Sequence, residues 1–372
     1  MPLVDASMEN LPVEVMVDIL SRLPVKTIIQ CKCVCKKWLD LVSDSYFADF
    51  QLSRSPAGIM IYHDSDHNKE NTGYHKSGIW VEVEDKPDHH NLPHNRVMSL
   101  DLNLPGIIHP VGSLNGLICL WQYNRKTSNT YICNPITREY MILPKQKYHR
   151  KEIYADVTYG FGVSSVAREY KVIRILQKSL SPAEVYTLGT GQWRSLGHVP
   201  YWFTGRCGQF LNGHAHWTIR DQDSSKKICA LDFDKETFEL FPSPPPEEAF
   251  IYFDCLGVVR GCLCRCDTYY SKFTVWVMKE YGVKKSWHKE FVIERCMDPN
   301  LDLLRVEPLY PIEGFEDGTI LMASYQNKVF VYCPQRKTIV DREVFGGYFY
   351  GLSYHPSFLR LHNFENGRVQ LF

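Results

Sequence analysis

Cysteine and histidine are the residue types in this chain whose spacing could support metal chemistry. Cys262, Cys264 and Cys266 alternate along one short segment, and Cys255 lies shortly before them. Alternate residues of a strand face the same side, so these thiols would share one face. Tetrahedral zinc sites usually take ligand pairs from turns with Cys-x-x-Cys spacing, which this segment lacks. We therefore interpret the four cysteines as packed, reduced thiols and predict no metal site.

Two further groups are weaker metal candidates. Cys31, Cys33 and Cys35 lie in a helical pattern in which Cys33 points away from the other two, so packing is favoured over metal binding. His214 and His216 would share one face of a strand, but no nearby residue completes a site. We predict a structural or surface role for both histidines.

Two polar segments have alternative interpretations. The stretch between His63 and His109 holds seven of the fourteen histidines. It could be a metal-binding or pH-sensing loop, but we favour a solvated insertion between early strands, with residues 80–84 as a strand. Residues 243–248 (Ser-Pro-Pro-Pro-Glu-Glu) could be a polyproline ligand. We interpret them as a stiff connection between sheets, because strand-like sequence resumes on both sides.

Motifs of common enzyme classes are missing from the sequence. It contains no Gly-x-x-x-x-Gly-Lys-Ser/Thr loop for phosphates, no Gly-x-Ser-x-Gly elbow and no His-Glu-x-x-His helix. Missing motifs make catalysis less expected without excluding it, and we predict a protein that is not an enzyme and has no cofactor.

The N-terminal segment has the pattern of a small helical module. Val13, Met16, Ile19, Leu20 and Leu23 recur at helical spacing. Pro12 lies at the start of this helix and Pro24 ends it. A second apolar stripe follows, formed by Ile28, Cys31, Val34, Cys35, Trp38, Leu41 and Val42. A piece of about 40 residues rarely buries enough surface to fold firmly alone, so we expect a partner protein to cover part of it and the β-rich body to leave that part free.

Short strands separated by turn residues replace the helical pattern from about Gly58 onward. Apolar strands that begin with glycine recur at Gly116, Gly213, Gly261 and Gly318, and less regularly at residues 160–162. If residues 160–162 mark a repeat between Gly116 and Gly213, the repeat length is near 48 residues, which is typical of a four-stranded propeller blade. The length of this region predicts about six blades.

Composition limits the partners. The chain has 42 basic and 42 acidic residues among its 372, so a generic nucleic-acid or anionic-membrane binder is not expected. Apolar runs are shorter than the roughly 20 residues that span a bilayer, and no secretory signal is evident at the N-terminus. Thirteen cysteines without a secretory route predict reduced thiols and a location in the cytoplasm, the nucleus or both.

The helical module contains three recognisable motifs: Leu11-Pro12-x-Glu14-Val15, residues 19–26 (Ile-Leu-Ser-Arg-Leu-Pro-Val-Lys) and residues 33–38 (Cys-Val-Cys-Lys-Lys-Trp). In these motifs the module resembles an F-box. Members of that family bind a Skp-like adaptor protein, which in turn binds a cullin. The resemblance implies an adaptor-binding surface formed by Leu11, Pro12, Val15, Ile19, Leu20, Leu23, Pro24, Val34, Cys35, Trp38 and Leu41.

The β-rich part contains four further motifs: residues 114–119 (Leu-Asn-Gly-Leu-Ile-Cys), residues 133–144 (which begin Cys-Asn-Pro), residues 159–162 (Tyr-Gly-Phe-Gly) and Leu211-Asn212-Gly213 before Trp217. In these motifs it resembles the F-box-associated interaction domain of plant F-box proteins, which is kelch-like. The expected fold class is therefore α+β by domain. A small three-helix F-box (residues 8–50) precedes an all-β, kelch-like β-propeller (residues 55–372).

These resemblances imply a substrate-recognition subunit of a Skp–cullin–F-box ubiquitin ligase. The propeller would bind an unknown target protein, and the cullin would be reached only through the adaptor. Aromatic and arginine side chains in funnel loops are the expected target contacts, namely Trp121, Tyr201, Trp202, Arg206, Arg220, Arg265, Tyr269, Tyr270 and Tyr325. A stand-alone propeller hydrolase or lyase, and a scaffold that recruits no cullin, remain as alternatives.

Overall fold

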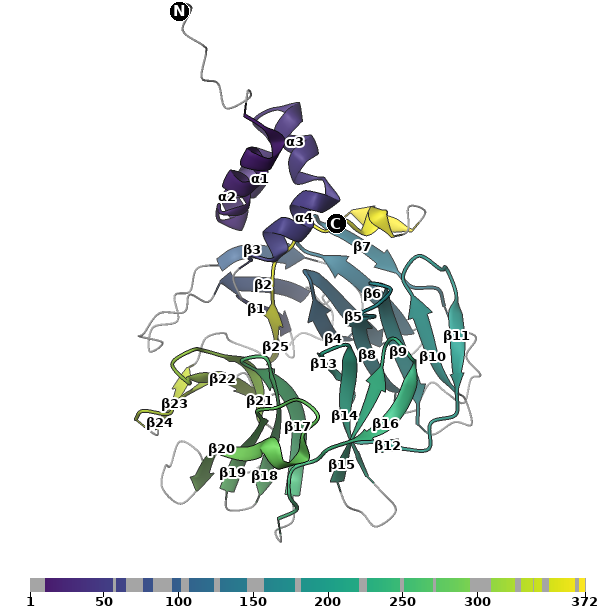
Figure 1. Cartoon of the computed structure of the whole chain (residues 1–372), viewed down its shortest axis with the longest axis vertical. Coiled ribbons are helices and arrows are strands. Elements are labelled where there is room, and N and C mark those ends of the chain that lie inside the picture. Colours follow the sequence, from purple (N-terminus) through teal and green to yellow (C-terminus); the bar gives the residue numbers. More distant parts are fainter. Residues whose placement is uncertain are drawn as a thin grey trace, which may run out of the picture.

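The computed structural model of the chain begins with a helical module and continues into a ring of sheets (Figure 1). It describes residues 11–55, 58–64, 76–82, 96–101, 107–123, 128–145, 157–177, 182–220, 226–247, 251–269, 272–294, 309–324, 329–336, 338–342, 348–364 and 368–371.

The module has four helices rather than the three expected. They are α1 (Val13–Ser21), α2 (Val25–Cys31), α3 (Lys36–Val42) and α4 (Ser45–Leu52). Pro12 and Pro24 stand immediately before α1 and α2, where a missing N–H costs little. The unexpected helix α4 begins after Asp44, whose carboxylate accepts a hydrogen bond from the Tyr46 amide at 2.8 Å. Such an N-cap stabilises the start of a helix.

The described strands form six antiparallel sheets, here called blades A to F. Blade A contains β1 (Gly58–Asp64), β2 (Lys76–Glu82), β3 (Arg96–Asp101) and β25 (Tyr348–Tyr354). Blade B contains β4 (Ile107–Leu114), β5 (Leu117–Tyr123), β6 (Ser128–Asn134), β7 (Glu139–Ile142) and β26 (Val369–Leu371). Blade C contains β8 (Val157–Val163), β9 (Tyr170–Leu176), β10 (Ala183–Thr187) and β11 (Trp193–Gly197).

The second half of the ring has the same plan. Blade D contains β12 (Trp202–Phe203), β13 (Gln209–Leu211), β14 (His214–Arg220), β15 (Lys226–Asp232) and β16 (Thr237–Phe241). Blade E contains β17 (Ile251–Val259), β18 (Cys262–Tyr269), β19 (Lys272–Met278) and β20 (Trp287–Glu294). Blade F contains β21 (Leu309–Gly314), β22 (Ile320–Ser324), β23 (Val329–Cys333) and β24 (Thr338–Arg342). Two 3₁₀ helices, Lys284–Ser286 and Leu361–Asn363, complete the described elements.

The inner strands close into a ring. Around the ring, β4 contacts β8, and β8 contacts β13 and β14 of blade D, which in turn contact β17. Strand β17 contacts β21, β21 contacts β25, and β25 contacts β4, which completes the circle. Figure 1 shows this circular order. The fold is therefore a β-propeller behind a helical module, which confirms the predicted fold class.

The two ends of the β-rich region meet in the first two blades. Strand β25 pairs with β1 in blade A, and β26 pairs with β7 in blade B. Each pairing joins residues more than 200 positions apart. Such long-range pairing joins the end of the chain to the first two blades and so closes the ring.

The recurring glycines lie where the inner strand of a blade turns into the second strand. Asn115-Gly116, Asn212-Gly213 and Arg260-Gly261 have positive φ at both residues, as a tight hairpin turn requires. The glycines at 160 and 162 are different. Both lie inside the inner strand β8. They mark the additional blade predicted between Gly116 and Gly213, but the corresponding turn of blade C comes later, before β9.

Gly162 is required for packing between blades rather than for a turn. A Cβ atom at this position would lie 2.3 Å from Cε2 of Phe233 and 2.5 Å from Cδ2 of Phe210, both in blade D. We expect Gly162→Ala to lower the free energy of unfolding by about 1–3 kcal/mol, as overpacked sites do. Urea titration would measure this loss. Gly112→Ala is the matched control, because its nearest new contact is 3.8 Å away, and an equal loss in both variants would contradict the explanation.

Candidate functional site

Helix α1 is apolar on two faces. Met16, Val17 and Leu20 are buried, on the side that packs against α4. Val15 and Ile19 lie one turn apart on another face and are 43% and 36% exposed. The single apolar stripe predicted for this helix is therefore divided between a buried side and a free side.

The residues predicted to bind an adaptor fall into three groups. Pro12, Val15, Ile19, Pro24 and Val34 are exposed, and Val34 in the turn after α2 reaches 63%. Leu11, Leu23, Cys35, Trp38 and Leu41 are half-buried. Leu20 is only 1% exposed, which corrects its assignment to the surface. Helical spacing places Leu20 with Met16 and Val17 on the inner face, so its side chain is not available to a partner.

The module also exposes apolar side chains that the sequence pattern did not place at this surface. Val13, Leu39 and Tyr46 are between 43% and 57% exposed. Six of the thirteen exposed large apolar side chains in the described part of the chain lie within residues 11–55. Scattered exposed apolar residues are ordinary, but a concentration of them marks an interaction surface.

The inner side of the module packs on the propeller. Its buried residues join one core with residues of blades A and B, including Met60, Ile118 and Tyr354. The ring of Phe47 in α4 meets that of Phe358 edge-on at 5.8 Å, and the Ser55 hydroxyl donates to the Pro356 carbonyl at 2.7 Å. The module is thus held firmly while its outer face stays free.

Two buried side chains of blade B hold the segment after β25 that supports this joint. The Asn134 amide donates to the carbonyls of Ser357 and Leu359 at 3.0 and 2.6 Å. The Glu139 carboxylate accepts from Leu361 N at 2.6 Å and from Arg360 Nε at 3.0 Å. We call residues 355–364 the C-terminal strap. It connects blade A, blade B and the helical module.

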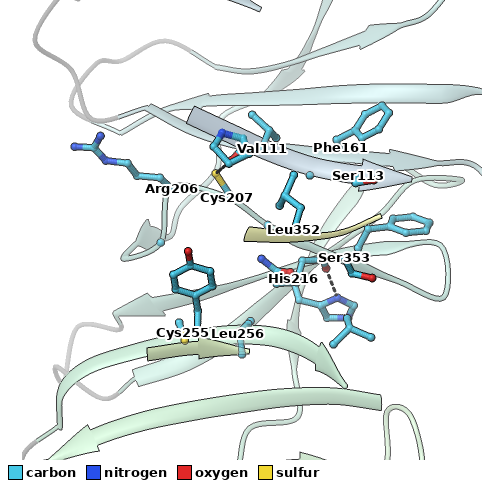
Figure 2. Close-up of a pocket in the computed structure, with 18 of the residues that line it drawn as sticks. Val111, Ser113, Phe161, Arg206, Cys207, His216, Cys255, Leu256, Leu352 and Ser353 are labelled. Carbon is cyan, nitrogen blue, oxygen red and sulfur yellow. Dashed lines mark hydrogen bonds between the residues drawn. The ribbon is translucent and has the colours of Figure 1, made fainter. Parts of the chain in front are cut away.

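A cavity of about 900 Å³ runs along the propeller axis (Figure 2). Residues from all six inner strands line it, among them Val111, Phe161, Cys255 and Leu352. Leu52 of α4, Asn115 and His355 line the end at which β4 and β25 terminate. His109, Arg206, Phe253 and Tyr310 line the other end, where the inner strands begin. The helical module therefore lies at one end of the channel, and we call the other end the distal mouth.

Several residues predicted to contact a target lie toward the distal mouth. Trp202 is 48% exposed, and Arg206 and Arg220 are exposed. Trp121 is nearly buried but lines the cavity, where it stacks on His109 with ring centroids 5.3 Å apart. Tyr201 is half-buried in the core of blades C and D. Phe253, His109 and Tyr310 also line this end and were missed, because β-strand sequence alone does not show which residues face the channel.

Two of the predicted contacts are buried. Arg265 is 4% exposed and donates through Nε to Asp267 at 2.8 Å, so a neighbouring carboxylate holds it inside blade E. Tyr269 is 2% exposed, at the end of the second strand of the same blade. Neither side chain is available to a target, which corrects both assignments. Tyr270 and Tyr325 lie outside the described residues.

His216 lines the cavity with both ring nitrogens engaged. Nδ1 lies 3.0 Å from the Gln209 carbonyl, and Nε2 lies 2.9 Å from the Tyr281 hydroxyl; a neutral ring that donates from Nδ1 and accepts at Nε2 satisfies both. Burial lowers the pKa of His216 from 6.5 to about 4. The predicted structural role of His216 is consistent with this environment.

The depressed pKa of His216 makes a prediction about stability. The unfolded chain binds a proton at this residue below about pH 6.5, whereas the folded chain does so only near pH 4. Protonation therefore favours the unfolded chain, and the free energy of unfolding falls as the pH drops from 6.5 toward 4. We expect roughly 2 kcal/mol of the loss between pH 7 and pH 5 to come from His216. Urea titrations at several pH values should show a smaller loss of unfolding free energy between pH 7 and pH 5 in His216→Gln than in the parent, and the full loss in the exposed control His198→Gln. The same pH dependence in His216→Gln and the parent would refute this explanation.

Cys264 and Cys266 of blade E are buried, and Cys255 and Cys262 are half-buried. Cys255 pairs with Cys266 across two strands, and its Sγ donates to the Leu309 carbonyl at 3.1 Å. The twelve cysteines within the described ranges are free thiols. In that part of the chain, no group of three or more His, Cys, Asp or Glu side chains is placed to hold a metal ion. None of the described helices is long and apolar enough to cross a bilayer.

Comparison with known proteins assigns both parts of the chain. Residues 8–48 match the F-box-like family, and residues 76–360 match the family described as F-box associated beta propeller domain. The second match covers more than half of the chain. The chain belongs to the F-box associated β-propeller family.

The matches to known plant F-box proteins span most of each chain. The chain is 27% identical over 362 residues to the F-box protein At3g07870 of Arabidopsis thaliana, a match that covers 86% of this chain and 81% of the relative. It is 28% identical over 351 residues to the F-box/kelch-repeat protein At3g23880 of the same plant, covering 88% of each. The F-box protein CPR1, also from Arabidopsis thaliana, is 26% identical over 334 residues, covering 77% of this chain and 74% of the relative. The predicted resemblance to plant F-box proteins is confirmed.

Proposed function

We propose that this F-box protein is the substrate-recognition subunit of a Skp–cullin–F-box type ubiquitin ligase. The observation that carries the proposal is the free face of α1, where Val15 and Ile19 are exposed within the segment that matches the F-box family. An apolar face that the rest of the chain leaves open suits a stable protein partner. We assign a Skp-like adaptor to this face, with a cullin reached through the adaptor.

In this proposal the propeller binds a target protein and contributes no catalytic residue. Holding the target beside the ligase raises the effective concentration of its lysine side chains near the activated ubiquitin. His216, a potential base in the channel, has both ring nitrogens engaged, which favours a binding role over that of a hydrolase or lyase. Action in the cytoplasm or nucleus, where the ligase would meet its targets, is part of the same proposal.

Affinity purification of the tagged full-length chain from plant cells with blocked proteasomes tests this role. The expected result is recovery of a Skp-like adaptor and a cullin, together with ubiquitin-conjugated proteins. Recovery of adaptor without cullin would indicate the scaffold alternative instead. Recovery of neither, with the chain folded and soluble, would contradict the proposal.

A further inference from the structure

The central channel carries apolar side chains along its middle. Val111 of β4, Leu256 of β17 and Leu352 of β25 come from three different blades, lie within their strands and line the same cavity. Figure 2 shows these side chains around the space between the inner strands. The volume of about 900 Å³ falls in the range of sites that enclose small molecules, and such sites are mostly apolar with a few placed polar groups.

Two glycines leave part of the channel wall hollow. Gly112 and Gly205 line the cavity, and a Cβ atom there would have its nearest neighbour at 3.8 Å and 3.9 Å, respectively. Neither glycine has a positive φ. Gly208, by contrast, is required for packing, because its Cβ would lie 2.3 Å from Cε2 of Trp217. Larger residues would therefore fit at Gly112 and Gly205, and the wall keeps space that packing does not require.

The described lining of the channel offers one unpaired charge besides its histidines. Arg206 and Asp254 are the other charged residues on that lining. The Asp254 carboxylate is bound to Lys226 of blade D, and the Asp254 side chain is 5% exposed. Arg206 is exposed at the distal mouth and forms no ion pair with a described residue. A guanidinium group can bind a carboxylate through two parallel hydrogen bonds.

The backbone that carries Arg206 is anchored to two blades. The Arg206 carbonyl accepts from the Tyr159 amide at 2.8 Å, and the Gly208 amide donates to the Tyr159 carbonyl at 2.8 Å. Cys207 Sγ donates to the Pro110 carbonyl of blade B at 3.3 Å. Figure 2 shows Arg206 extending from this segment at the edge of the cavity. A site that is fixed before binding loses little entropy when a ligand arrives.

We propose that the channel binds an elongated small molecule with an apolar body and one carboxylate at its end. The body lies between Val111, Leu256 and Leu352, and the carboxylate lies at the distal mouth, where Arg206 binds it. A nucleotide is disfavoured, because its phosphates carry more negative charge than one guanidinium group neutralises. The assignment goes beyond the function proposed above, because occupancy of the channel requires no adaptor.

Binding of dansyl-undecanoate to the full-length chain tests this assignment, because dansyl emission rises when the dye leaves water. The expected result is saturable, one-to-one binding. The amide of the same molecule lacks the charge and should bind at least about threefold more weakly, since ion pairs of exposed groups are modest. Arg206→Gln should abolish this difference, and Arg138→Gln, at an exposed turn after β6, should keep it. The comparison measures the whole field at the mouth, including that of Asp156, Asp221 and Asp223, which lie outside the described residues.

Filling the channel should weaken the binding of both probes. Leu352→Trp adds bulk to the middle of the lining, and Gly112→Leu fills the hollow beside Phe161. Each substitution should weaken binding of the acid and of the amide at least about tenfold. Leu240→Trp, on the outer strand of blade D and 55% exposed, is the matched control and should leave both affinities within about twofold. The thermal midpoint of each variant reports whether it is folded.

Four outcomes would overturn the assignment. They are absence of saturable binding, equal affinity for the acid and the amide, affinities unchanged in both Leu352→Trp and Gly112→Leu, and equal effects of Arg206→Gln and Arg138→Gln. Adaptor affinity measured on the same preparations reports separately on the proposed function, because the lining of the channel and the free face of α1 are different surfaces.

Discussion

Replacing Val15 and Ile19 with aspartate should abolish adaptor binding while the protein remains folded. Both side chains lie on the free face of α1 and are exposed, so the substitution exposes no core and should not change the thermal midpoint. In the complex, the two carboxylates would lie unpaired in an apolar interface, which costs several kcal/mol. We expect the affinity for a purified Skp-like adaptor, measured by titration calorimetry, to fall at least about 100-fold.

The matched control for this double variant is Val166→Asp. Val166 is 85% exposed on the propeller, so the substitution adds the same chemistry at a distance from the module. It should bind adaptor like the parent. Trp38→Ala is less informative, because Trp38 packs against the shared core and its loss would also weaken folding. Equal adaptor affinity of Val15→Asp/Ile19→Asp and Val166→Asp would show that the free face of α1 is not the binding surface.

Removing the carboxylate of Glu139 should cause a large loss of stability. Glu139 is 1% exposed and accepts hydrogen bonds from Leu361 N and Arg360 Nε, with His362 Nδ1 at 3.1 Å. Glu139→Ala leaves these donors unsatisfied and releases the C-terminal strap from blade B. We expect the free energy of unfolding to fall by about 2–3 kcal/mol, because the buried Leu361 amide loses its acceptor, while the partly exposed Arg360 can turn to solvent. Urea titration at constant pH measures this loss.

The Glu139 variant should also have a local signature. Glu139→Gln keeps an acceptor for the Leu361 amide and should lose less stability than Glu139→Ala, and the exposed control Glu239→Ala should lose less than about 0.5 kcal/mol. Hydrogen exchange of the Leu361 amide should speed up in Glu139→Ala beyond the change expected from global unfolding. If Glu139→Ala were as stable as Glu239→Ala, the strap would not be held as described.

The sequence predicted the module because its helices carry strong local signals. Prolines precede α1 and α2, and apolar residues recur at helical spacing. Periodicity did not reveal that α1 has two apolar faces with different partners, because spacing states which residues share a face and not what covers that face. Leu20 was therefore assigned to the surface although it belongs to the core shared with the propeller.

The glycines show a similar limit. At Gly116 and Gly213 the residue allows a positive φ in a turn, and this local role was recognised from Asn-Gly pairs. At Gly160 and Gly162 the absence of a side chain makes room for Trp217 and Phe233 of the next blade, which depends on residues more than 50 positions away. A count that treats all these glycines alike therefore finds blade C but places its first turn inside β8.

The least predictable features join distant parts of the chain. Asn134 was recognised as part of a loop motif, but its amide holds carbonyls of the C-terminal strap more than 220 residues later. Arg265 was proposed as a target contact, because nothing local showed that its strand was buried and that Asp267 would pair with it. Contacts of this kind follow from ring closure and blade stacking, which local patterns do not encode.

Hydrogen exchange of the full-length chain, with and without a purified Skp-like adaptor, tests the central claim most directly. The account predicts a one-to-one complex in which exchange slows in α1 and in the turn between α2 and α3, while the blades far from the module stay unchanged. Absence of a complex, or slowing confined to the propeller, would contradict the assignment of the free face of α1 to the adaptor.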